Sequence, residues 1–247
     1  MSDQWDVVIG ATSGIGMSLA RDLARAGRRL VITGSDGDEL DRCARDLALR
    51  GSPEVRAVVA DARDPATHEA WVRTFDDPAR VVDRVVLLTG LLGDMDAAKV
   101  DASRAREIFD VNVTGALALL HPVARALAKA GRGRIAIVGS VAGDRGRASN
   151  YPYGAAKAAV AAWAEGLRGE LFRHGVHVCL VKPGFVDTAM TYGRPGMFLV
   201  ATPESIARGI LRALDRRADV AYLPWFWGPI LWAIRMIPTR VFKRLRL

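Results

Sequence analysis

Short apolar runs alternate with stretches of helical pattern along most of this chain of 247 residues. The runs cover residues 5–10, 29–33, 55–60, 81–89, 134–139 and 176–181. Helical patterns follow them, up to residue 26 and at about residues 38–49, 66–75, 112–130 and 153–172. Strands separated by helices in this way form a parallel sheet with helices on both faces. The alternation therefore predicts an α/β fold, a single doubly wound domain.

The basic residues are concentrated at one end of the chain. No linker or repeat divides residues 1–219, and we expect them to form the folded domain, with residues 220–247 as a separate apolar and basic C-terminal segment. After Asp219 there is no acidic residue, whereas the segment carries Arg235, Arg240, Lys243, Arg244 and Arg246. These five account for most of the net charge of +8. A net charge that lies largely in the tail does not favour a nucleic-acid partner.

The C-terminal segment is also rich in large apolar side chains. Residues 223–237 include three tryptophans and one charge, Arg235, but they are too few for a span, which needs about 20 residues. Aromatic residues followed by basic ones suit a segment that lies in the headgroup layer of a membrane. The alternative is a buried C-terminal helix that closes a pocket or a subunit interface.

A glycine-rich turn follows the first predicted strand and opens the first predicted helix. In GATSGIG, Gly10, Gly14 and Gly16 let the backbone approach a pyrophosphate, and the positive end of the helix dipole would face the phosphates. The spacing is GxxxGxG rather than GxGxxG, and a purely structural turn is the alternative.

Tyr153 and Lys157 stand four residues apart in a stretch without proline, and so they share one face of a predicted helix. An ammonium beside a phenol lowers the phenol pKa from about 10, which suits a general acid. Ser140 ends the strand at residues 134–139 and can reach the same substrate oxygen from there. Taken singly, each of these residues has an ordinary structural explanation. Ser140 does not fit a hydrolase nucleophile elbow, because VGSVAG has no glycine two residues before the serine.

Taken together and in order, the motifs resemble those of the short-chain dehydrogenases/reductases over essentially the whole chain. The resemblance is carried by GATSGIG, Asp61, Asn112 in VNVTG, Ser140, the Tyr153-x-x-x-Lys157 pair, and Pro183-Gly184 followed by Thr188. It implies a Rossmann-like fold, hydride transfer with NAD(P)H, and a homodimer or homotetramer. One departure is LLTGLLG at residues 87–93, where the family usually has an asparagine-alanine-glycine turn. A protein that binds the nucleotide without catalysis is a distant alternative.

The resemblance also implies roles for single residues. Tyr153 would donate a proton to the carbonyl oxygen, Ser140 would bind that oxygen, Lys157 would hold the nicotinamide ribose, and Asn112 would position a water. The residues expected to bind the cofactor are Gly10, Ser13, Gly14, Ile15, Gly16, Ser35, Asp61, Lys157, Pro183, Gly184, Val186 and Thr188. No basic residue follows the second predicted strand or precedes Gly14, which favours NADH over NADPH. Ser35 could accept a phosphate, and Asp36 would oppose one.

A narrower resemblance concerns the substrate. GLLGD, the stretch at residues 140–158 and the C-terminal ending resemble reductases that act on a 2-keto-pentose carried on a polyprenyl phosphate. Another apolar ketone, such as a 3-oxoacyl, sterol or sphingoid compound, fits the same loops. The residues expected near the substrate are Leu91, Leu92, Arg145, Arg147, Met190 and Phe198. The two arginines could bind a lipid phosphate, or they could belong to a solvated basic loop.

The remaining features indicate a reducing compartment. Cys43 and Cys179 have no CxxC spacing, and the four histidines have no metal-site spacing, so we expect neither a disulfide nor a metal. The N-terminus has no basic region followed by a long apolar run, so we expect no signal peptide. The expected location is the cytoplasm, with peripheral contact to the inner face of the membrane.

Overall fold

Seven parallel strands form the sheet at the centre of the molecule. The computed structural model describes residues 4–77, 80–193 and 196–245. The strands are β1 (Trp5–Ile9), β2 (Arg29–Gly34), β3 (Val55–Val59), β4 (Val82–Leu87), β5 (Gly133–Val138), β6 (Val176–Pro183) and β7 (Val220–Leu223). They lie in the order β3-β2-β1-β4-β5-β6-β7. The order reverses between β1 and β4, and ligands bind beyond the carboxyl ends of the strands at such a point.

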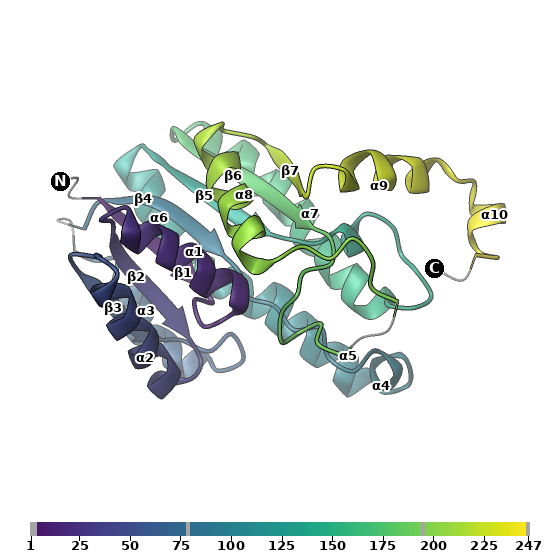
Figure 1. Cartoon of the computed structure of the whole chain (residues 1–247), viewed down its shortest axis with the longest axis horizontal. Coiled ribbons are helices and arrows are strands. Elements are labelled where there is room, and N and C mark those ends of the chain that lie inside the picture. Colours follow the sequence, from purple (N-terminus) through teal and green to yellow (C-terminus); the bar gives the residue numbers. More distant parts are fainter. Residues whose placement is uncertain (1–3, 78–79, 194–195, 246–247) are drawn as a thin grey trace.

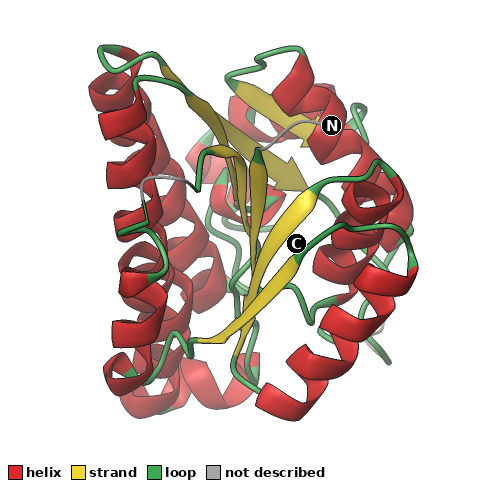
Figure 2. Cartoon of the chain, turned by 90° about the vertical axis from the view of Figure 1, so that its left-hand side faces the viewer, coloured by secondary structure: helices red, strands yellow, loops and turns green. Residues whose placement is uncertain are grey.

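Helices cover both faces of the sheet (Figures 1 and 2). They are α1 (Gly14–Arg25), α2 (Gly37–Leu49), α3 (His68–Arg73), α4 (Met95–Val100), α5 (Ala102–Phe109), α6 (Ala116–Ala130), α7 (Tyr151–Phe172), α8 (Pro203–Asp215), α9 (Trp227–Met236) and α10 (Thr239–Phe242). Three short turns of other helix types complete the set: η1 (Pro65–Thr67), η2 (Asp110–Gly115) and η3 (Val141–Gly143). Here η2 is a π-helix that joins α5 to α6 without a break.

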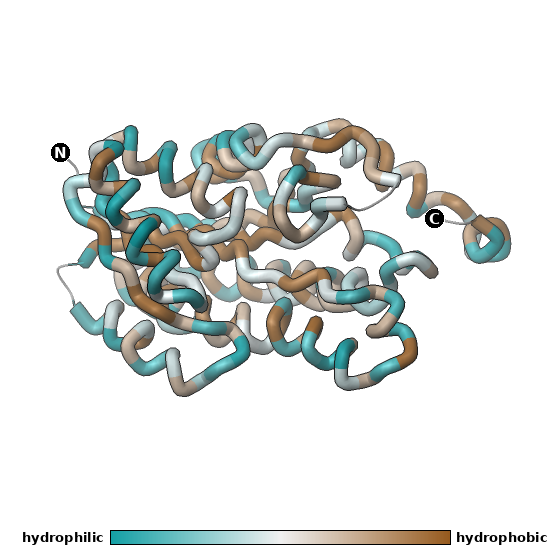
Figure 3. Tube along the Cα trace, turned by 60° about the horizontal axis from the view of Figure 1, so that its bottom comes forward, coloured by the Kyte–Doolittle hydropathy of each residue, from teal (hydrophilic) through white to brown (hydrophobic). Residues whose placement is uncertain are grey.

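Side chains that alternate along the strands build one apolar layer on each face. Val7 and Ile9 of β1 pack against α3, α6 and α7, whereas Val8 packs against α1, α2 and α8. In Figure 3 the strands are mostly brown, the colour of apolar residues, where they run between the helix layers. This period of two is what a sheet with both faces covered requires. The α/β fold class expected from the alternation of strands and helices is confirmed.

Polar side chains cap the amino ends of several helices. The Ser13 hydroxyl accepts a hydrogen bond from the Gly16 amide at the start of α1, and Thr202 accepts one from Ser205 at the start of α8. Asp36 caps α2 in the same way, with the Glu39 amide as donor. Each cap satisfies an amide that has no partner within its helix.

Two parts of the fold differ from the sequence-based expectation. The helix expected at residues 112–130 begins at Ala102, and α4 precedes it. The sheet also extends four residues beyond the boundary expected at residue 219, because β7 pairs with β6. The segment that leaves the sheet therefore begins at Pro224, and we call residues 224–245 the C-terminal arm; Arg246 lies outside the described residues.

One helical stretch among the described residues, Ala102–Ala130, is long and apolar enough to cross a membrane by composition. Half of its most apolar window is buried inside the protein. Leu119, Leu120 and Val123 of this stretch pack against the sheet. Its apolar character is thus explained by its place in the core.

Candidate active site

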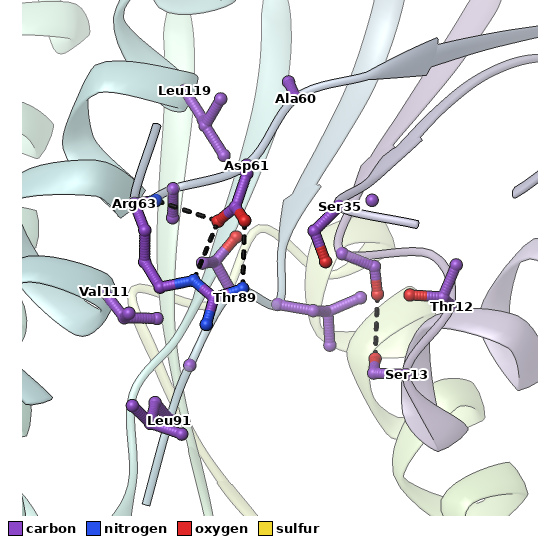
Figure 4. Close-up of a pocket in the computed structure, with 15 residues that line it drawn as sticks. Thr12, Ser13, Ser35, Ala60, Asp61, Arg63, Thr89, Leu91, Val111 and Leu119 are labelled. Atoms are coloured by element: carbon purple, nitrogen blue, oxygen red, sulfur yellow. Dashed lines mark hydrogen bonds and ion pairs between the residues drawn. The ribbon is translucent and has the colours of Figure 1, made fainter. Parts of the chain in front are cut away.

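A cavity of about 320 Å³ opens at the carboxyl ends of β1, β2 and β4 (Figure 4). Four of the residues expected to bind a cofactor line it: Gly10, Ser13, Ser35 and Asp61. The lining also includes residues that the sequence analysis did not name: Thr12, Gly34, Ala60, Ala62, Arg63, Leu88, Thr89, Gly90, Val111 and Leu119. Residues 88–90 could have been found from sequence, because they directly follow β4 at the point where the strand order reverses.

The glycine turn is shaped by close approach of the backbone. A Cβ on Gly16 would lie 2.3 Å from the carbonyl oxygen of Gly10, so only glycine lets α1 begin directly against the turn. Gly14 lies against the Thr188 side chain, with 3.5 Å between a Cβ built there and Thr188 Cγ2. The turn, the start of α1 and the segment after β6 therefore meet at one place. Ile15 lies in this first turn of α1 and packs against the apolar layer on that face.

Asp61 is held at the other side of the cavity by Arg63. The guanidinium donates to both carboxylate oxygens, from Nε at 3.2 Å and from Nη2 at 3.0 Å, and the Arg63 amide donates at 2.9 Å. These bonds hold the pKa of Asp61 below its usual value. The carboxylate is thus fixed and ionised in the wall of the cavity (Figure 4).

Tyr153 and Lys157 lie on the first turns of α7. The Lys157 ammonium lies 5.8 Å from the centre of the Tyr153 ring and donates to the Val138 carbonyl at 3.3 Å. The side chain is buried, with 4% of Lys157 exposed, and it makes no ion pair with any residue that the structure describes. Burial lowers the pKa of Lys157 to about 8. A cation in a dry site beside a phenol is suited to stabilise the phenolate form.

Asn112 lies in the π-helix η2 and connects it to the turn after β4. Its Nδ2 donates to the carbonyls of Leu91 at 2.6 Å and Ile108 at 2.8 Å, and its Oδ1 accepts from the Leu91 amide. A Cβ on Gly90 would lie 3.1 Å from Asn112 Oδ1 and 3.2 Å from Lys157 Nζ. Although LLTGLLG departs from the family pattern, Gly90 thus brings the turn, η2 and α7 together. π-helical turns are frequent at functional sites.

The loop that begins at Ser140 lies against the same part of α7. Ser140 caps η3, and its Oγ accepts from the Ala142 amide at 3.1 Å. A Cβ on Gly143 would lie 2.7 Å from the Lys157 carbonyl carbon, and one on Gly154 would lie 3.0 Å from the Ala142 oxygen. The four residues expected to be catalytic therefore belong to segments in direct contact with one another.

The segment after β6 crosses the site from the other side. Val186 forms a bridge with Ala201, and this bridge closes the base of the loop at residues 187–200. Gly184 lies beneath the indole of Trp227, since a Cβ there would lie 1.9 Å from Trp227 Nε1. Pro183, Gly184, Val186 and Thr188 are thus placed together at the end of β6.

The residues expected near the substrate fall into different environments. Leu91 lines the cavity, whereas Leu92 is buried with Ile108 and Ala156 in a cluster that supports Tyr153. Met190 is exposed, and Phe198 packs on Phe185 and Trp227. Leu92 therefore contributes to packing, in contrast to the substrate contact expected from sequence.

The two arginines of the loop also differ. Arg145 donates from Nη1 to the carbonyls of Ile234 and Arg235, so its guanidinium binds the C-terminal arm instead of pointing freely from a basic loop. The Nε of Arg147 is buried and has no hydrogen-bond partner among the described residues. Burial lowers the pKa of Arg147. Of these two described arginines, Arg147 is the one with a buried nitrogen that lacks a partner.

A buried ionic triad that the sequence analysis missed lies beside this loop. Asp144 accepts from Lys182 at 2.5 Å and from the Tyr222 hydroxyl at 2.7 Å. Burial, together with the Asp144 carboxylate, raises the pKa of Tyr222. Asp144 lies in the loop after β5 and Lys182 lies on the neighbouring strand β6, whereas Tyr222 comes from β7, so the three residues meet only in the folded sheet. Within the part of the chain that the structure describes, no three His, Cys, Asp or Glu residues gather as metal ligands would.

Comparison with known proteins gives matches along the whole chain. The family model described as short chain dehydrogenase matches residues 4–195. An uncharacterized oxidoreductase of Mycobacterium tuberculosis is 36% identical over 239 residues, which are 97% of this chain and 96% of the relative. A short-chain dehydrogenase from Sphingobium yanoikuyae in complex with NADPH superposes with a TM-score of 0.82 at 27% identity, covering 98% of this chain and 96% of that one. A short chain dehydrogenase from Burkholderia cenocepacia in complex with NADP gives a TM-score of 0.82 at 25% identity over both full chains.

Proposed function

This chain belongs to the short-chain dehydrogenase family and is an NAD(P)-dependent oxidoreductase, and from this premise we propose that it reduces the ketone of an apolar, lipid-linked substrate. The observation that carries the proposal is the convergence of four segments: the turn after β4, η2, the Ser140 loop and the first turns of α7. They surround Tyr153 and the buried cation of Lys157, a pair suited to protonate a carbonyl oxygen.

The cavity fits a dinucleotide. It lies at the amino end of α1, the glycine turn lines it with backbone, and Asp61 is fixed at its far side. Reduced nicotinamide, when bound, supplies the hydride. In our proposal the turn residues (Gly10, Ser13, Gly14, Ile15 and Gly16) hold the phosphates, Ser35 and Asp61 hold the adenosine part, and Lys157, Pro183, Gly184, Val186 and Thr188 hold the nicotinamide part.

The side chains of the site then divide the proton transfer among them. The Tyr153 hydroxyl donates its proton to the carbonyl oxygen, a step that contributes about 10²–10⁴-fold to the rate. The Ser140 hydroxyl donates a hydrogen bond to the same oxygen and fixes its position. Lys157, with a pKa of about 8, remains mostly protonated at pH 7 and stabilises the tyrosinate that forms. Asn112 positions a water that returns the proton through Lys157.

We propose a pentose with a 2-keto group, carried on a polyprenyl phosphate, as the substrate. This is the substrate of the reductase partner of decaprenylphosphoryl-β-D-ribose 2-epimerase, which this chain resembles in its loops and C-terminal ending. Two observations support it. Arg147 has a desolvated guanidinium with an unsatisfied donor, which suits a phosphate, and Phe185, Phe198 and Trp227 form an aromatic cluster beside Gly184, which suits an apolar chain.

The second candidate is a reductase of another apolar ketone, such as a 3-oxoacyl, sterol or sphingoid compound. The aromatic cluster supports it equally, and only the Arg147 guanidinium favours a phosphate-bearing substrate. Oxidation of NADH and NADPH should therefore be followed with polyprenyl keto-sugars extracted from membranes and with simpler ketones, using Tyr153→Phe as the inactive control. Turnover of the simpler ketones alone would reject the polyprenyl substrate.

For the cofactor, we propose a preference for NADH. After β2, Ser35 lines the described cavity, whereas Asp36 caps the start of α2. The one arginine of the lining, Arg63, is held by Asp61. The ratio of kcat/KM for NADH to that for NADPH tests this preference, and a ratio below one would reject it.

We also propose a cytoplasmic enzyme, a homodimer or homotetramer, that binds the inner face of the membrane through its C-terminal arm. Trp225, Trp232 and Met236 of the arm are exposed, and Arg240, Lys243 and Arg244 follow them. Sedimentation with vesicles of 30% anionic lipid, with and without residues 224–247, tests the membrane contact. Light scattering tests the oligomeric state.

A further inference from the structure

The C-terminal arm runs outward from the sheet edge and yet touches the catalytic side of the molecule (Figure 1). Within α9 only Trp227 and Leu231 are buried, and they form one cluster with Val141. Val141 directly follows Ser140. One face of the arm is therefore packed beside the serine of the site, and its other face carries the exposed Trp232 and Met236.

The first turn of α9 is anchored at the end of β6. The Trp227 indole lies directly on Gly184, and its ring centre lies 5.8 Å from that of Phe185 and 5.5 Å from that of Phe198. Tyr222, which binds Asp144, lies against Gly228 of the same turn. Trp227 is 2% exposed, and so it forms part of an apolar wall between Val141 and the loop after β6.

The far end of α9 is anchored by one side chain, Arg145. Its guanidinium donates to the carbonyls of Ile234 and Arg235 in the last turn of the helix, and the Ile234 carbonyl also accepts from the Ile237 amide. The guanidinium stacks on the Phe242 ring with 3.7 Å between Cζ and the ring centre. A cation at the C-terminus of a helix also interacts favourably with its dipole. Asp144 and Arg145 are consecutive, so the loop that starts at Ser140 is connected to both ends of α9, to the first end through Tyr222 and to the last end through Arg145.

We infer that Arg145 is a positioning residue: it holds the C-terminal arm against the Ser140 loop, and the arm in this position selects ketones with a long apolar chain. This inference rests on the proposed ketone reduction. Arg145 thereby acquires a role different from the head-group contact expected from sequence, which leaves Arg147 as the loop arginine able to meet a phosphate. Trp227 and Leu231 are buried and hold the wall in place, and the exposed ring of Phe198, which packs on Trp227, would contact the apolar chain.

Two measurements on Arg145→Ala, Arg145→Lys and the control Arg125→Ala test the inference. Arg125 is exposed on α6 and makes no hydrogen bond or ion pair among the described residues. The first measurement is hydrogen exchange of the α9 amides by mass spectrometry. The second is kcat and KM for methyl ketones with chains of 4 to 12 carbons, a series in which each buried methylene improves binding by up to about fourfold.

We expect Arg145→Ala to exchange the amides of residues 230–237 about tenfold faster than the wild type, with the remaining helices unchanged. Its KM for the 12-carbon ketone should rise about tenfold, whereas its kcat, and its KM for the 4-carbon ketone, should stay within twofold. Arg145→Lys should recover part of both effects, because it keeps one donor and loses the flat stacking face. Arg125→Ala should match the wild type.

Unchanged exchange in Arg145→Ala would overturn the role of Arg145, and an unchanged dependence on chain length would overturn the role of the arm in selection. If the wild-type chain reduced neither these ketones nor the polyprenyl keto-sugars, the proposed reaction itself would fail, and with it the selection. The exchange of residues 230–237 would still decide whether Arg145 holds the arm.

Discussion

Asp6 and Lys157 are both buried charges, and they lie at opposite ends of the parallel sheet. At the amino end, Asp6 accepts from Arg28 Nε at 2.8 Å and from its Nη2 at 3.0 Å, and Asp83 binds both Arg28 and Arg134. At the carboxyl end, Lys157 has a single backbone carbonyl at 3.3 Å. One end therefore pairs its charges, although burial still raises the pKa of Asp6, whereas the candidate active site holds a cation without an ion-pair partner among the described residues.

The difference shows which end can be changed without loss of the fold. Removing one partner from a compensated network leaves the other charge buried and alone, which costs stability. Removing an uncompensated cation relieves the protein of a desolvation cost and should instead stabilise it. Substitutions at the two ends should thus separate stability from activity.

The largest expected effect is on turnover at the carboxyl end. Tyr153→Phe removes the proton donor and should lower kcat about 10³-fold, within the range for general acid catalysis. Cofactor affinity, measured by titration calorimetry, should stay within twofold, and so should the melting temperature within about 2 °C. Tyr151→Phe is the matched control, since Tyr151 is exposed. Substantial turnover by Tyr153→Phe would show that another group protonates the ketone.

At the amino end, Asp6→Ala should lower the free energy of unfolding by about 3–5 kcal/mol, because Arg28 loses its most buried partner. Denaturant unfolding measures the loss. Cofactor affinity of the folded fraction should not change, because Asp6 lies at the far end of β1 from the cavity. A stability close to that of the wild type would mean that Asp83 alone compensates Arg28.

Lys157→Met should raise the free energy of unfolding, whereas Asp6→Ala should lower it. The folded pKa of about 8 lies below the usual 10.5, so the unfolded chain binds more protons between these values, and wild-type stability rises with pH through this window. We therefore expect the variant to be more stable than the wild type by about 3 kcal/mol at pH 7, and the difference to shrink toward zero near pH 10.5. Activity should be lost at every pH.

Unfolding curves at pH 7, 9 and 10.5 measure this difference, with the exposed Lys129→Met as the control, for which no such trend is expected. A Lys157→Met variant less stable than the wild type at pH 7 would show that the cation is compensated in solution.

The smallest effect is expected at Asp61, the carboxylate that lines the cavity and is paired with Arg63. Asp61→Asn keeps the shape of the side chain but weakens its bonds to Arg63, and we expect cofactor affinity to fall about tenfold, equivalent to about 1.4 kcal/mol. Calorimetry at two salt concentrations measures this. Affinity equal to that of the wild type would mean that Asp61 does not contribute to the adenosine site.

Most of the fold could be predicted from the sequence because local patterns determine it. The apolar runs predicted six of the seven strands within a few residues. The strand β7 was not predicted, because VAYL is short, only partly buried, and becomes a strand by pairing with β6. The π-helix at Asn112 was not predicted either, because its extra residue per turn does not change the apolar pattern in a recognisable way.

Part of the candidate site could also be predicted from local sequence patterns. Tyr153 and Lys157 share a helix, so their spacing predicted a common face. Arg145 could not be interpreted from sequence, because its partners Ile234 and Phe242 come some ninety residues later and belong to an arm whose path depends on β7. The Asp144, Lys182 and Tyr222 triad is likewise a product of tertiary contact.

The contact of Gly184 with Trp227 means that the residue type at one of these positions restricts the residue type at the other. Any side chain at residue 184 would occupy the space of the indole, so a relative with a larger residue there must carry a smaller one at 227 or turn its last helix away. A tryptophan packed at 227 should therefore occur among relatives only with glycine at 184. Sequences that keep glycine and tryptophan together would mark the members that place a C-terminal helix beside the catalytic serine.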